Sequence, residues 1–262
     1  MTGDAWSIAL TPGYLWVQVD PPVDSVVRVD KATGEVVPMV AAGRFAASGP
    51  EGLWVVSGDW LVKIDPTSGA ELLKVSSGGA LDVAEGSVWL RTESGKLLSV
   101  DPDSGKTSLV AKTDPASCLE PKRLEIAFGY AWQSCKEGAV VRMALDGSQT
   151  SVIPTEAGAH SWTVTDDAVW VTNYEAGSVT RIDPDTGGTT TIPGAGEGVG
   201  ITSGGGFVWA ADFMGISQID PDTNEIVGHL DVGPGEYYEL VWDDGVIWAS
   251  TRTARLLKIQ AL

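Results

Sequence analysis

The feature that most constrains the fold is a tryptophan that recurs along the whole chain at intervals of 35 to 43 residues. Around each one lie short runs in which apolar and polar residues alternate, separated by Asp, Gly and Pro, as in residues 161–193. Alternation with a period of two between turn residues is typical of β-strands joined by hairpins. Repeats of about 40 residues with four strands each predict the blades of a β-propeller. The repeated tryptophans are Trp16, Trp54, Trp89, Trp132, Trp170, Trp209 and Trp248.

A second repeated motif marks the turn after the third strand of most repeats. Asp-Pro presets such a turn, and the closing Gly or Asn supplies the left-handed residue of the hairpin. We therefore interpret these acidic motifs as structural turns rather than as ligand sites. The copies are RVDKATG at 28–34, KIDPTSG at 63–69, SVDPDSG at 99–105, RIDPDTG at 181–187 and QIDPDTN at 218–224.

These patterns predict an all-β fold, a seven-bladed β-propeller of four-stranded antiparallel blades, with residues 1–262 as a single domain. The last blade is expected to be incomplete. Its predicted strands are 239–242, 246–251 and 255–259, and only three residues follow them. Residues 1–5, which precede the first predicted strand, are too few to replace a full strand.

Charge and hydropathy exclude several classes of partner. The chain has 35 Asp and Glu against 17 Lys and Arg, a net charge of −18. Nucleic acid binding depends on Lys and Arg that replace counterions, so we expect no nucleic acid partner. No apolar run is long enough to span a membrane. Many of the acidic residues fall in turns at one end of the blades, which we interpret as a solubility surface, with a partner site as the alternative. We expect a monomer.

The two cysteines of the chain bear on its compartment. Cys118 precedes the first strand of the fourth repeat and Cys135 ends its second strand. These positions are neighbours in an antiparallel pair, so a disulfide is geometrically reasonable, with two free cysteines as the alternative. A disulfide favours an extracytoplasmic or secreted protein. The N-terminal residues lack the basic start and the apolar core of a signal peptide. A cytoplasmic location is the alternative.

Ligands of propellers usually bind where the first strand of each blade begins and the second ends. The repeat identifies these positions, and they differ from blade to blade, as expected for a site placed on a repeated scaffold. The alternative is a hydrated end with no ligand. The candidate ligand-binding residues are Trp6, Arg44, Lys122, His160, Asn173, Tyr174, Asp212, Tyr238 and Arg252.

The chemistry of these residues favours an anionic ligand. Arg44, Lys122 and His160 are cationic or can become so, and Trp6 and Tyr238 add aromatic surface. Cations beside aromatic rings suit a small anionic or partly aromatic molecule. Asn173 and Asp212 occupy the same position of adjacent repeats, so a divalent cation, Mg²⁺ or Ca²⁺, is a candidate cofactor there.

The chain resembles the virginiamycin B lyase-like and YncE-like propellers. The resemblance rests on GVGITSGG at 198–205, VWVTN at 169–173 and SVTRIDPDTG at 178–187, and it extends over all seven repeats. It implies a propeller fold. In the lyase, a metal-assisted elimination opens a lactone and uses a His and a Glu of the last blade. Here Tyr238 stands at the His position and Thr251 or Arg252 at the Glu position.

Three hypotheses follow for the function. The first is a non-catalytic binding or sensing propeller with a small-molecule ligand. The second is a metal-assisted lyase or lactonase, for which His160 is the candidate catalytic residue. The third is a scaffold that binds a protein partner. A His–carboxylate pair or a metal at the ligand end would favour the second over the first.

Overall fold

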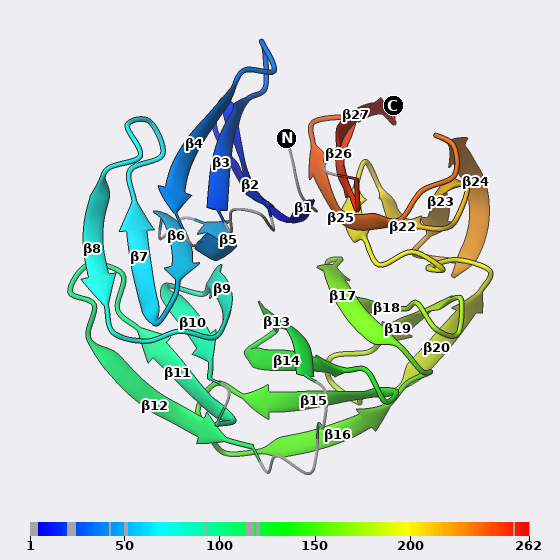
Figure 1. The fold of residues 1–262 in the computed structure, drawn as a ribbon. Helices are drawn as coiled ribbons and strands as arrows, with labels where there is room; N and C mark the ends of the chain where they lie inside the picture. The colour runs from blue at the N-terminus through cyan, green and yellow to red at the C-terminus, as the bar shows by residue number, and fades with distance from the viewer. Residues whose placement is uncertain are drawn as a thin grey trace. The chain divides into compact units, whose positions relative to one another are not determined.

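The computed structural model describes residues 5–19, 25–41, 43–49, 52–92, 94–113, 118, 121–253 and 255–261. The described part is all-β, with antiparallel sheets whose strands follow one another in chain order (Figure 1). Seven sheets are present, six with four strands and the last with three, as the sequence predicts. The fold is thus of the seven-bladed β-propeller class. No helix among the described residues is long and apolar enough to cross a membrane.

The strands of the first three sheets are, in order, β1 (Ala5–Thr11), β2 (Tyr14–Val19), β3 (Ser25–Asp30), β4 (Val36–Ala41), β5 (Gly43–Gly49), β6 (Gly52–Ser57), β7 (Trp60–Ile64), β8 (Glu71–Val75), β9 (Ala80–Ala84), β10 (Ser87–Arg91), β11 (Lys96–Val100) and β12 (Thr107–Lys112). The fourth and fifth sheets consist of β13 (Pro121–Ala127), β14 (Tyr130–Cys135), β15 (Ala139–Ala144), β16 (Thr150–Pro154), β17 (Ala159–Val164), β18 (Val169–Asn173), β19 (Ser178–Ile182) and β20 (Thr189–Pro193).

The last two sheets consist of β21 (Ile201–Gly204), β22 (Phe207–Ala211), β23 (Gly215–Asp220), β24 (Glu225–Asp231), β25 (Tyr237–Asp243), β26 (Val246–Thr251) and β27 (Leu256–Gln260). The predicted incompleteness of the last blade is therefore confirmed for the described residues. Of residues 1–5, which the sequence analysis considers too few to replace a full strand, residues 1–4 lie outside the described part.

The chain divides into two compact units. One comprises Met1–Pro115, Leu124–Ala131 and Met143–Thr150, and the other comprises Ala116–Arg123, Trp132–Arg142 and Ser151–Leu262. Within the first unit, the first strands of successive sheets, β1, β5 and β9, pack in a row. Within the second unit, β17, β21 and β25 do the same. The assignment of all residues to one domain stays a prediction.

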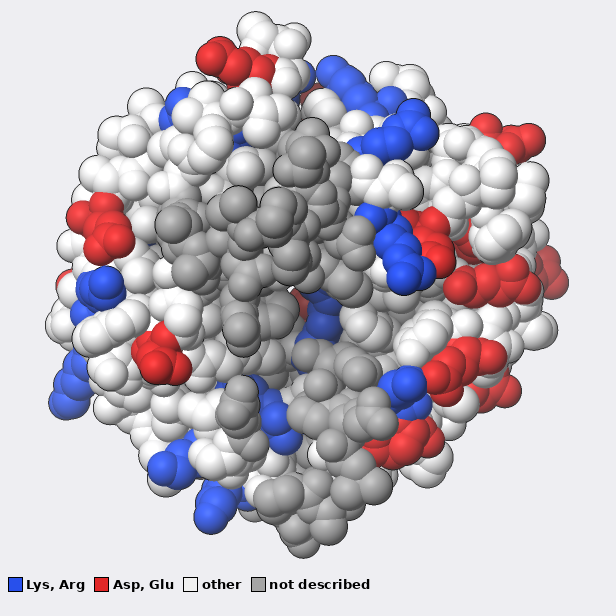
Figure 2. Space-filling view, viewed as in Figure 1, with Lys and Arg blue, Asp and Glu red and all other residues white. Residues whose placement is uncertain are grey.

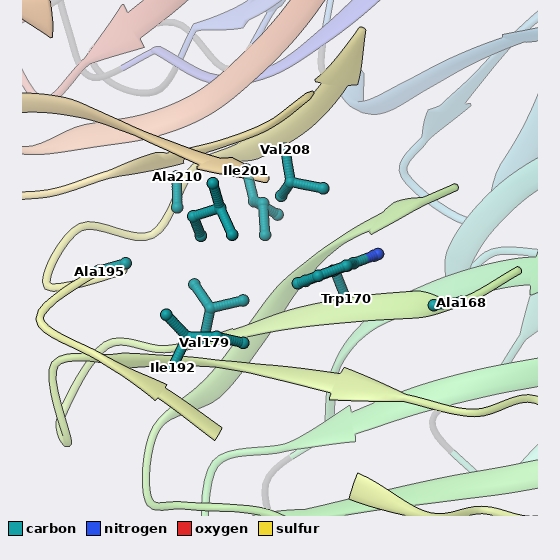
Figure 3. Close-up of a cluster of buried hydrophobic side chains, with 9 residues drawn as sticks. Ala168, Trp170, Val179, Ile192, Ala195, Ile201, Val208 and Ala210 are labelled. Carbon is teal, nitrogen blue, oxygen red and sulfur yellow. The ribbon is translucent and has the colours of Figure 1, made fainter. Parts of the chain in front are cut away.

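In four described clusters, the repeated tryptophan packs its own sheet onto the next. Figure 3 shows Trp170 of the fifth sheet in a cluster with Ile201 and Val208 of the sixth. Trp16, Trp54 and Trp209 make the corresponding contacts in their own clusters. All seven repeated tryptophans are at most 7% exposed, so the interpretation of this residue as core is confirmed.

The indole N–H groups of two repeated tryptophans form hydrogen bonds with residues close to them in sequence. The indole N–H of Trp170 donates to Thr165 Oγ1 at 3.0 Å, and that of Trp209 donates to the carbonyl of Gly204 at 3.0 Å. In both cases the acceptor lies five residues earlier, at the end of the first strand or directly after it. A buried indole N–H requires such a partner, so this strand end and the tryptophan hold each other in place.

Basic residues of the third strands connect neighbouring sheets. Arg142 lies over the Trp132 ring, 5.7 Å from its centroid, and donates to the carbonyl of Pro184 in the next sheet at 2.6 Å. Lys63 lies over Trp54 and donates to the carbonyl of Pro102 at 3.0 Å. The basic residue before the Asp turn thus binds the equivalent turn of the following sheet, a role that the sequence motif alone does not reveal.

The Asp turns are confirmed as structural. In the copy at 181–187, Asp183 Oδ1 accepts the N–H groups of Asp185 and Thr186 at 2.9 and 2.8 Å. The backbone hydrogen bond from Thr186 is the main reason that the pKa of Asp183 lies below its usual value. Asp30, Asp65 and Asp101 accept the same pair of N–H groups in their own turns.

Hydroxyl groups at the ends of two second strands form a further connection. Ser134 Oγ accepts the N–H of Arg123 at 3.2 Å and donates to the carbonyl of His160 in the next sheet at 2.6 Å. Thr172 Oγ1 accepts the N–H of Ser161 at 3.2 Å and donates to the carbonyl of Val199 at 2.9 Å. Each hydroxyl therefore joins its own first strand to the backbone of the following sheet.

The equivalent hydroxyl of the last sheet differs from these two. Ser250 Oγ is buried and makes no hydrogen bond with any residue that the structure describes. Substitutions at these three positions therefore distinguish the stability that the two hydrogen bonds contribute from the stability that the hydroxyl group contributes without them.

A disulfide joins Cys118 and Cys135, with a Cα–Cα distance of 5.4 Å and a sequence separation of 17. It anchors Cys118 to the end of β14, although 119–120 and 114–117 lie outside the described part. Cys118, Cys135 and Glu137 form a cluster of potential metal ligands within the described residues, but the two sulfur atoms are bonded to each other.

The hydroxyl connections lead to a first prediction. Ser134→Ala and Thr172→Val should each lower the free energy of unfolding by about 1–3 kcal/mol, because each leaves a buried backbone N–H and a carbonyl without a partner. Ser250→Ala is the matched control and should be nearly neutral. Urea unfolding followed by tryptophan fluorescence measures all three, and equal losses for Ser134→Ala and Ser250→Ala would contradict the assignment.

A second prediction concerns the disulfide. Closing a loop of this length stabilises a folded protein by about 3 kcal/mol through the unfolded state. The double variant Cys118→Ser/Cys135→Ser should therefore lose about that much stability, and reducing agent should affect the natural protein but not the variant. Thiol titration of the denatured, unreduced protein should find no free thiol, and two free thiols in protein prepared under oxidising conditions would contradict the bond.

Candidate functional site

The first strands of several sheets carry a β-bulge at the positions predicted to bind ligand. In the second sheet Gly43 pairs with Ser57 and Phe45 with Val56, so Arg44 is an extra residue. In the seventh sheet Tyr237 pairs with Thr251 and Glu239 with Ser250, so Tyr238 is the extra residue. The register shifts in the same place at Trp6 and Ser7 in β1 and at His160 and Ser161 in β17.

Bulges reorient side chains and are common beside active sites. The residues that vary most between the repeats thus lie where the backbone of the first strand departs from regular pairing. The backbones of Trp6, Arg44 and Lys122 lie in β1, β5 and β13, whereas their side chains lie outside the described residues. The described side chains of the predicted site all belong to the second compact unit.

His160 and Tyr174 lie together in the fifth sheet. Their rings are 6.0 Å apart and meet edge to face, and His160 Nδ1 lies 3.1 Å from Ser161 Oγ. The Tyr174 hydroxyl donates to Glu175 Oε1 at 3.1 Å, and the same oxygen pairs with Lys136 Nζ at 3.2 Å. Burial, then the hydrogen bond and charge of Glu175, raises the pKa of the Tyr174 phenol. The phenol therefore stays protonated at neutral pH.

Tyr238 and Arg252 share one carboxylate in the seventh sheet. Arg252 donates to both oxygens of Glu236 at 3.0 Å, and the Tyr238 hydroxyl donates to Glu236 Oε2 at 3.3 Å. Figure 2 shows that Lys and Arg lie beside Asp and Glu over the part of this face formed by β17–β27, at the right of the view. Despite the large negative charge of the chain, this end of the second unit therefore has mixed charge.

A loop between the two groups exposes apolar side chains. Phe213 and Met214, in the loop between β22 and β23, are 60% and 49% exposed. The carbonyl of Phe213 accepts the N–H of Gly235 at 3.2 Å, next to Glu236. The apolar surface of this loop thus adjoins the Tyr238 and Arg252 group.

The structure also contains an ion pair that the sequence analysis missed. Arg123 of β13 and Glu239 of β25 approach to 2.5 Å between NH2 and Oε2, with side chains 26% and 12% exposed. Burial raises the pKa of the Glu239 carboxyl above its usual value, while the charge of Arg123 and its hydrogen bond oppose that rise. Arg123 follows Lys122, and Glu239 follows Tyr238, so the pair lies at the level of the bulges.

A sequence signal for this pair does exist. Arg123 and Glu239 each stand nine residues before the repeated tryptophan of their sheet. The other five repeats have an uncharged residue there, namely Ser7, Phe45, Ala80, Ser161 and Gly200. Two opposite charges at one repeat position indicate a contact, but only if the two strands approach each other.

Asp212 is held by hydrogen bonds from the described residues around it. Its Oδ1 accepts the N–H groups of Met214 and Gly215, both at 2.8 Å, and its Oδ2 accepts the Ser217 hydroxyl at 2.7 Å. His229 Nε2 lies 3.2 and 3.0 Å from the two oxygens. His229 of β24 is therefore the partner of a nearly buried carboxylate.

Asn173 is fully buried at the equivalent position of the fifth sheet. Its amide nitrogen donates to Ser178 Oγ at 3.0 Å and to Thr180 Oγ1 at 2.8 Å, while its Oδ1 has no partner among the described residues. A carboxylate has about four acceptor sites, and the donors around Asp212 already use them. These residues fit the support of a loop better than the ligation of Mg²⁺ or Ca²⁺, and the shared cation stays a prediction.

The other end of the second unit has an acidic groove. It has a volume of about 400 Å³ and its lining includes Asp166, Asp167, Asp222 and Phe207. Asp167 pairs with Arg181 at 2.6 Å. Asp166, Asp167 and Asp222 are among the turn residues that the sequence analysis interprets as a solubility surface.

Comparisons with known proteins establish the fold. The chain is similar to the solved virginiamycin B lyase from Staphylococcus aureus, with 14% identity, a TM-score of 0.78 and coverage of 99% of this chain and 95% of that one. It is also similar to Kuenenia stuttgartiensis hydrazine synthase, with 14% identity, a TM-score of 0.79 and coverage of 99% and 96%.

A third similar structure is the extracellular domain of a one-component system from B. thetaiotaomicron, with 12% identity and a TM-score of 0.73. The match covers 96% of this chain and 40% of that one. No protein-family model matches the chain, and no curated protein matches it in sequence. At these identities, the similarities show the propeller fold alone.

The Asp212 network leads to a third prediction. Although burial acts to raise its pKa, the hydrogen bonds from Ser217, His229 and Met214 hold the Asp212 carboxyl below its usual pKa. The ionised group therefore stabilises the fold above about pH 4, the ordinary Asp range, and this contribution is lost as the pH falls through the lower folded value. Asp212→Asn should cost about 1–3 kcal/mol at pH 7, and the cost should shrink below pH 4.

Urea unfolding at pH 7 and at pH 3 tests this prediction. Asp222→Asn, in an exposed turn, is the control and should change stability little at either pH. Equal stability of Asp212→Asn and the natural protein at pH 7 would show that the network is not stabilising.

Proposed function

We propose that this protein is a non-catalytic binding or sensing propeller that takes up a small anionic ligand at the bulged ends of its first strands. The observation that carries the proposal is the coincidence of two independent features. In the second compact unit, the candidate residues His160 and Tyr238 depart from the repeat in sequence, and the strand that bears each of them departs from regular pairing at that position.

The surroundings of the bulges support a ligand with an anionic group and an apolar part. His160, Lys136 and Arg252 provide positive or protonatable groups, and Tyr174 and Tyr238 provide flat rings. Phe213 and Met214 add exposed apolar surface beside Tyr238. Charge-assisted hydrogen bonds give orientation, while the aromatic rings contribute contact area.

The last sheet favours binding over elimination chemistry. At the two positions where the resembled lyase family has its His and Glu, this chain has Tyr238 and Thr251 or Arg252. Tyr238 and Arg252 bind Glu236, and the Thr251 hydroxyl lies 3.3 Å from the carbonyl of Arg255. An arginine does not release its proton near neutral pH, so this group is suited to holding charge rather than to moving a proton.

The disulfide supports an extracytoplasmic location. Disulfides persist in oxidising compartments and are rare in the cytosol. The structural similarity to an extracellular domain of a one-component system is compatible with this location. A binding propeller outside the cytoplasm would report or deliver its ligand rather than transform it.

The proposal yields a fourth prediction. Arg44→Ala and Lys122→Ala should each weaken the binding of an anionic probe about tenfold, because each removes a charge-assisted hydrogen bond of roughly 1.5–3 kcal/mol. The unfolding temperature should stay unchanged. Isothermal titration calorimetry with benzoate, citrate and inorganic phosphate measures the effect, and Lys106→Ala, in a turn at the other end of its blade, is the control.

His160→Ala separates the two leading functions. A binding protein should lose affinity with no turnover to lose, whereas a lyase would lose turnover with its substrate affinity largely kept. Opening of a cyclic lactone substrate by the natural protein, abolished in His160→Ala, would overturn the proposal. Failure of every anionic probe to bind would also overturn it.

A further inference from the structure

The Arg123–Glu239 pair points to the way in which the ligand is held. We infer that Arg123 is the residue that binds the anionic group, that the group is a carboxylate, and that Glu239 occupies Arg123 until the ligand replaces it. This inference rests on the proposed function, since it names the ligand class and a residue of the same site.

The pair joins two strands that do not belong to consecutive sheets. Arg123 lies in β13 of the fourth sheet and Glu239 in β25 of the seventh, and the first strands between them, β17 and β21, pack in a row up to β25. The equivalent positions of those two sheets are Ser161 and Gly200. No long side chain from this position therefore competes for the guanidinium.

The surroundings of Arg123 connect it to the predicted site. The backbone N–H of Arg123 donates to Ser134 Oγ, and the Ser134 hydroxyl donates to the carbonyl of His160. On the other side, Glu239 directly follows Tyr238 at its bulge. The backbone of Arg123 is thus connected through Ser134 to the backbone of His160, and its side chain contacts the residue that follows Tyr238.

The energetics of the pair suit an exchange of carboxylates. Two largely buried charges pay a desolvation cost that their attraction only partly offsets, so such a pair contributes little net stability. Glu239 has Arg123 as its described partner, in contrast to Asp212 with its several donors. A ligand carboxylate offers Arg123 the same planar geometry and bidentate bonding.

The test compares the affinity of benzoate, an aromatic carboxylate, across matched variants by titration calorimetry. Glu239→Gln removes the internal competitor while keeping the shape of the side chain, so affinity should rise at least tenfold. Asp167→Asn removes the carboxylate of an arginine pair at the other end of the blades and should leave affinity unchanged. Unchanged or weakened binding by Glu239→Gln would overturn the exchange.

The role of Arg123 is tested with both charges removed. Arg123→Met alone leaves a buried carboxylate unpaired and risks misfolding, whereas Arg123→Met/Glu239→Gln removes both charges together. The double variant should fold, with an unfolding temperature near that of the natural protein, and should bind benzoate at least tenfold more weakly than Glu239→Gln does. Equal affinity of these two variants would show that Arg123 is not the anion-binding residue.

These results also separate this inference from the function on which it depends. Suppose that benzoate binds the natural protein and that Arg44→Ala or Lys122→Ala lowers its affinity, while the Arg123 and Glu239 variants leave the affinity unchanged. The proposed binding site is then supported, and the exchange of Glu239 for a ligand carboxylate is wrong. If benzoate, citrate and phosphate bind neither the natural protein nor Glu239→Gln, both the proposed function and the exchange fall.

Discussion

The rest of the structure depends on the packing of one tryptophan per sheet against the following sheet. A single hairpin sheet of this size cannot bury its apolar face alone, and stacking on a neighbour provides the missing core. A tryptophan removes roughly 200 Å² from water, which corresponds to about 5 kcal/mol of apolar burial before the entropy of ordering is counted. The clusters around Trp16, Trp54, Trp170 and Trp209 show the same contact in both compact units.

Polar connections surround this apolar contact and set the spacing between sheets. Basic residues of three third strands, Arg28, Lys63 and Arg142, each donate to a carbonyl in the corresponding turn of the next sheet. At the other end of the strands, the Ser134 and Thr172 hydroxyls reach the backbone of the next sheet. Because the middle of each blade is committed to these contacts, variation is concentrated at the strand ends, and there the bulges place the candidate ligand residues.

The charged groups at these ends differ in what they can do. Asp212 is surrounded by N–H and hydroxyl donors and by His229, so it fixes the loop that carries Phe213 and Met214. Glu239 faces Arg123 in a largely buried setting where ionisation is unfavourable. The first arrangement is typical of structural support, whereas the second is the ion pair for which we propose exchange with a ligand carboxylate.

The sequence by itself determined the features that depend on residues close together in the chain or on the repeat. The tryptophan cores, the Asp183-type turns and the three-stranded last sheet follow from spacing along the chain, whereas the sequence left two free cysteines as the alternative to the Cys118–Cys135 bond that the structure contains. The bulge positions of Arg44 and Tyr238 were anticipated only as places where the repeat is broken. Three contacts were decided by tertiary structure alone: Arg123 with Glu239, His229 with Asp212, and Arg142 with Pro184. Each joins side chains whose meeting depends on how strands and sheets approach in space, and a pattern of alternating residues carries no information about that distance.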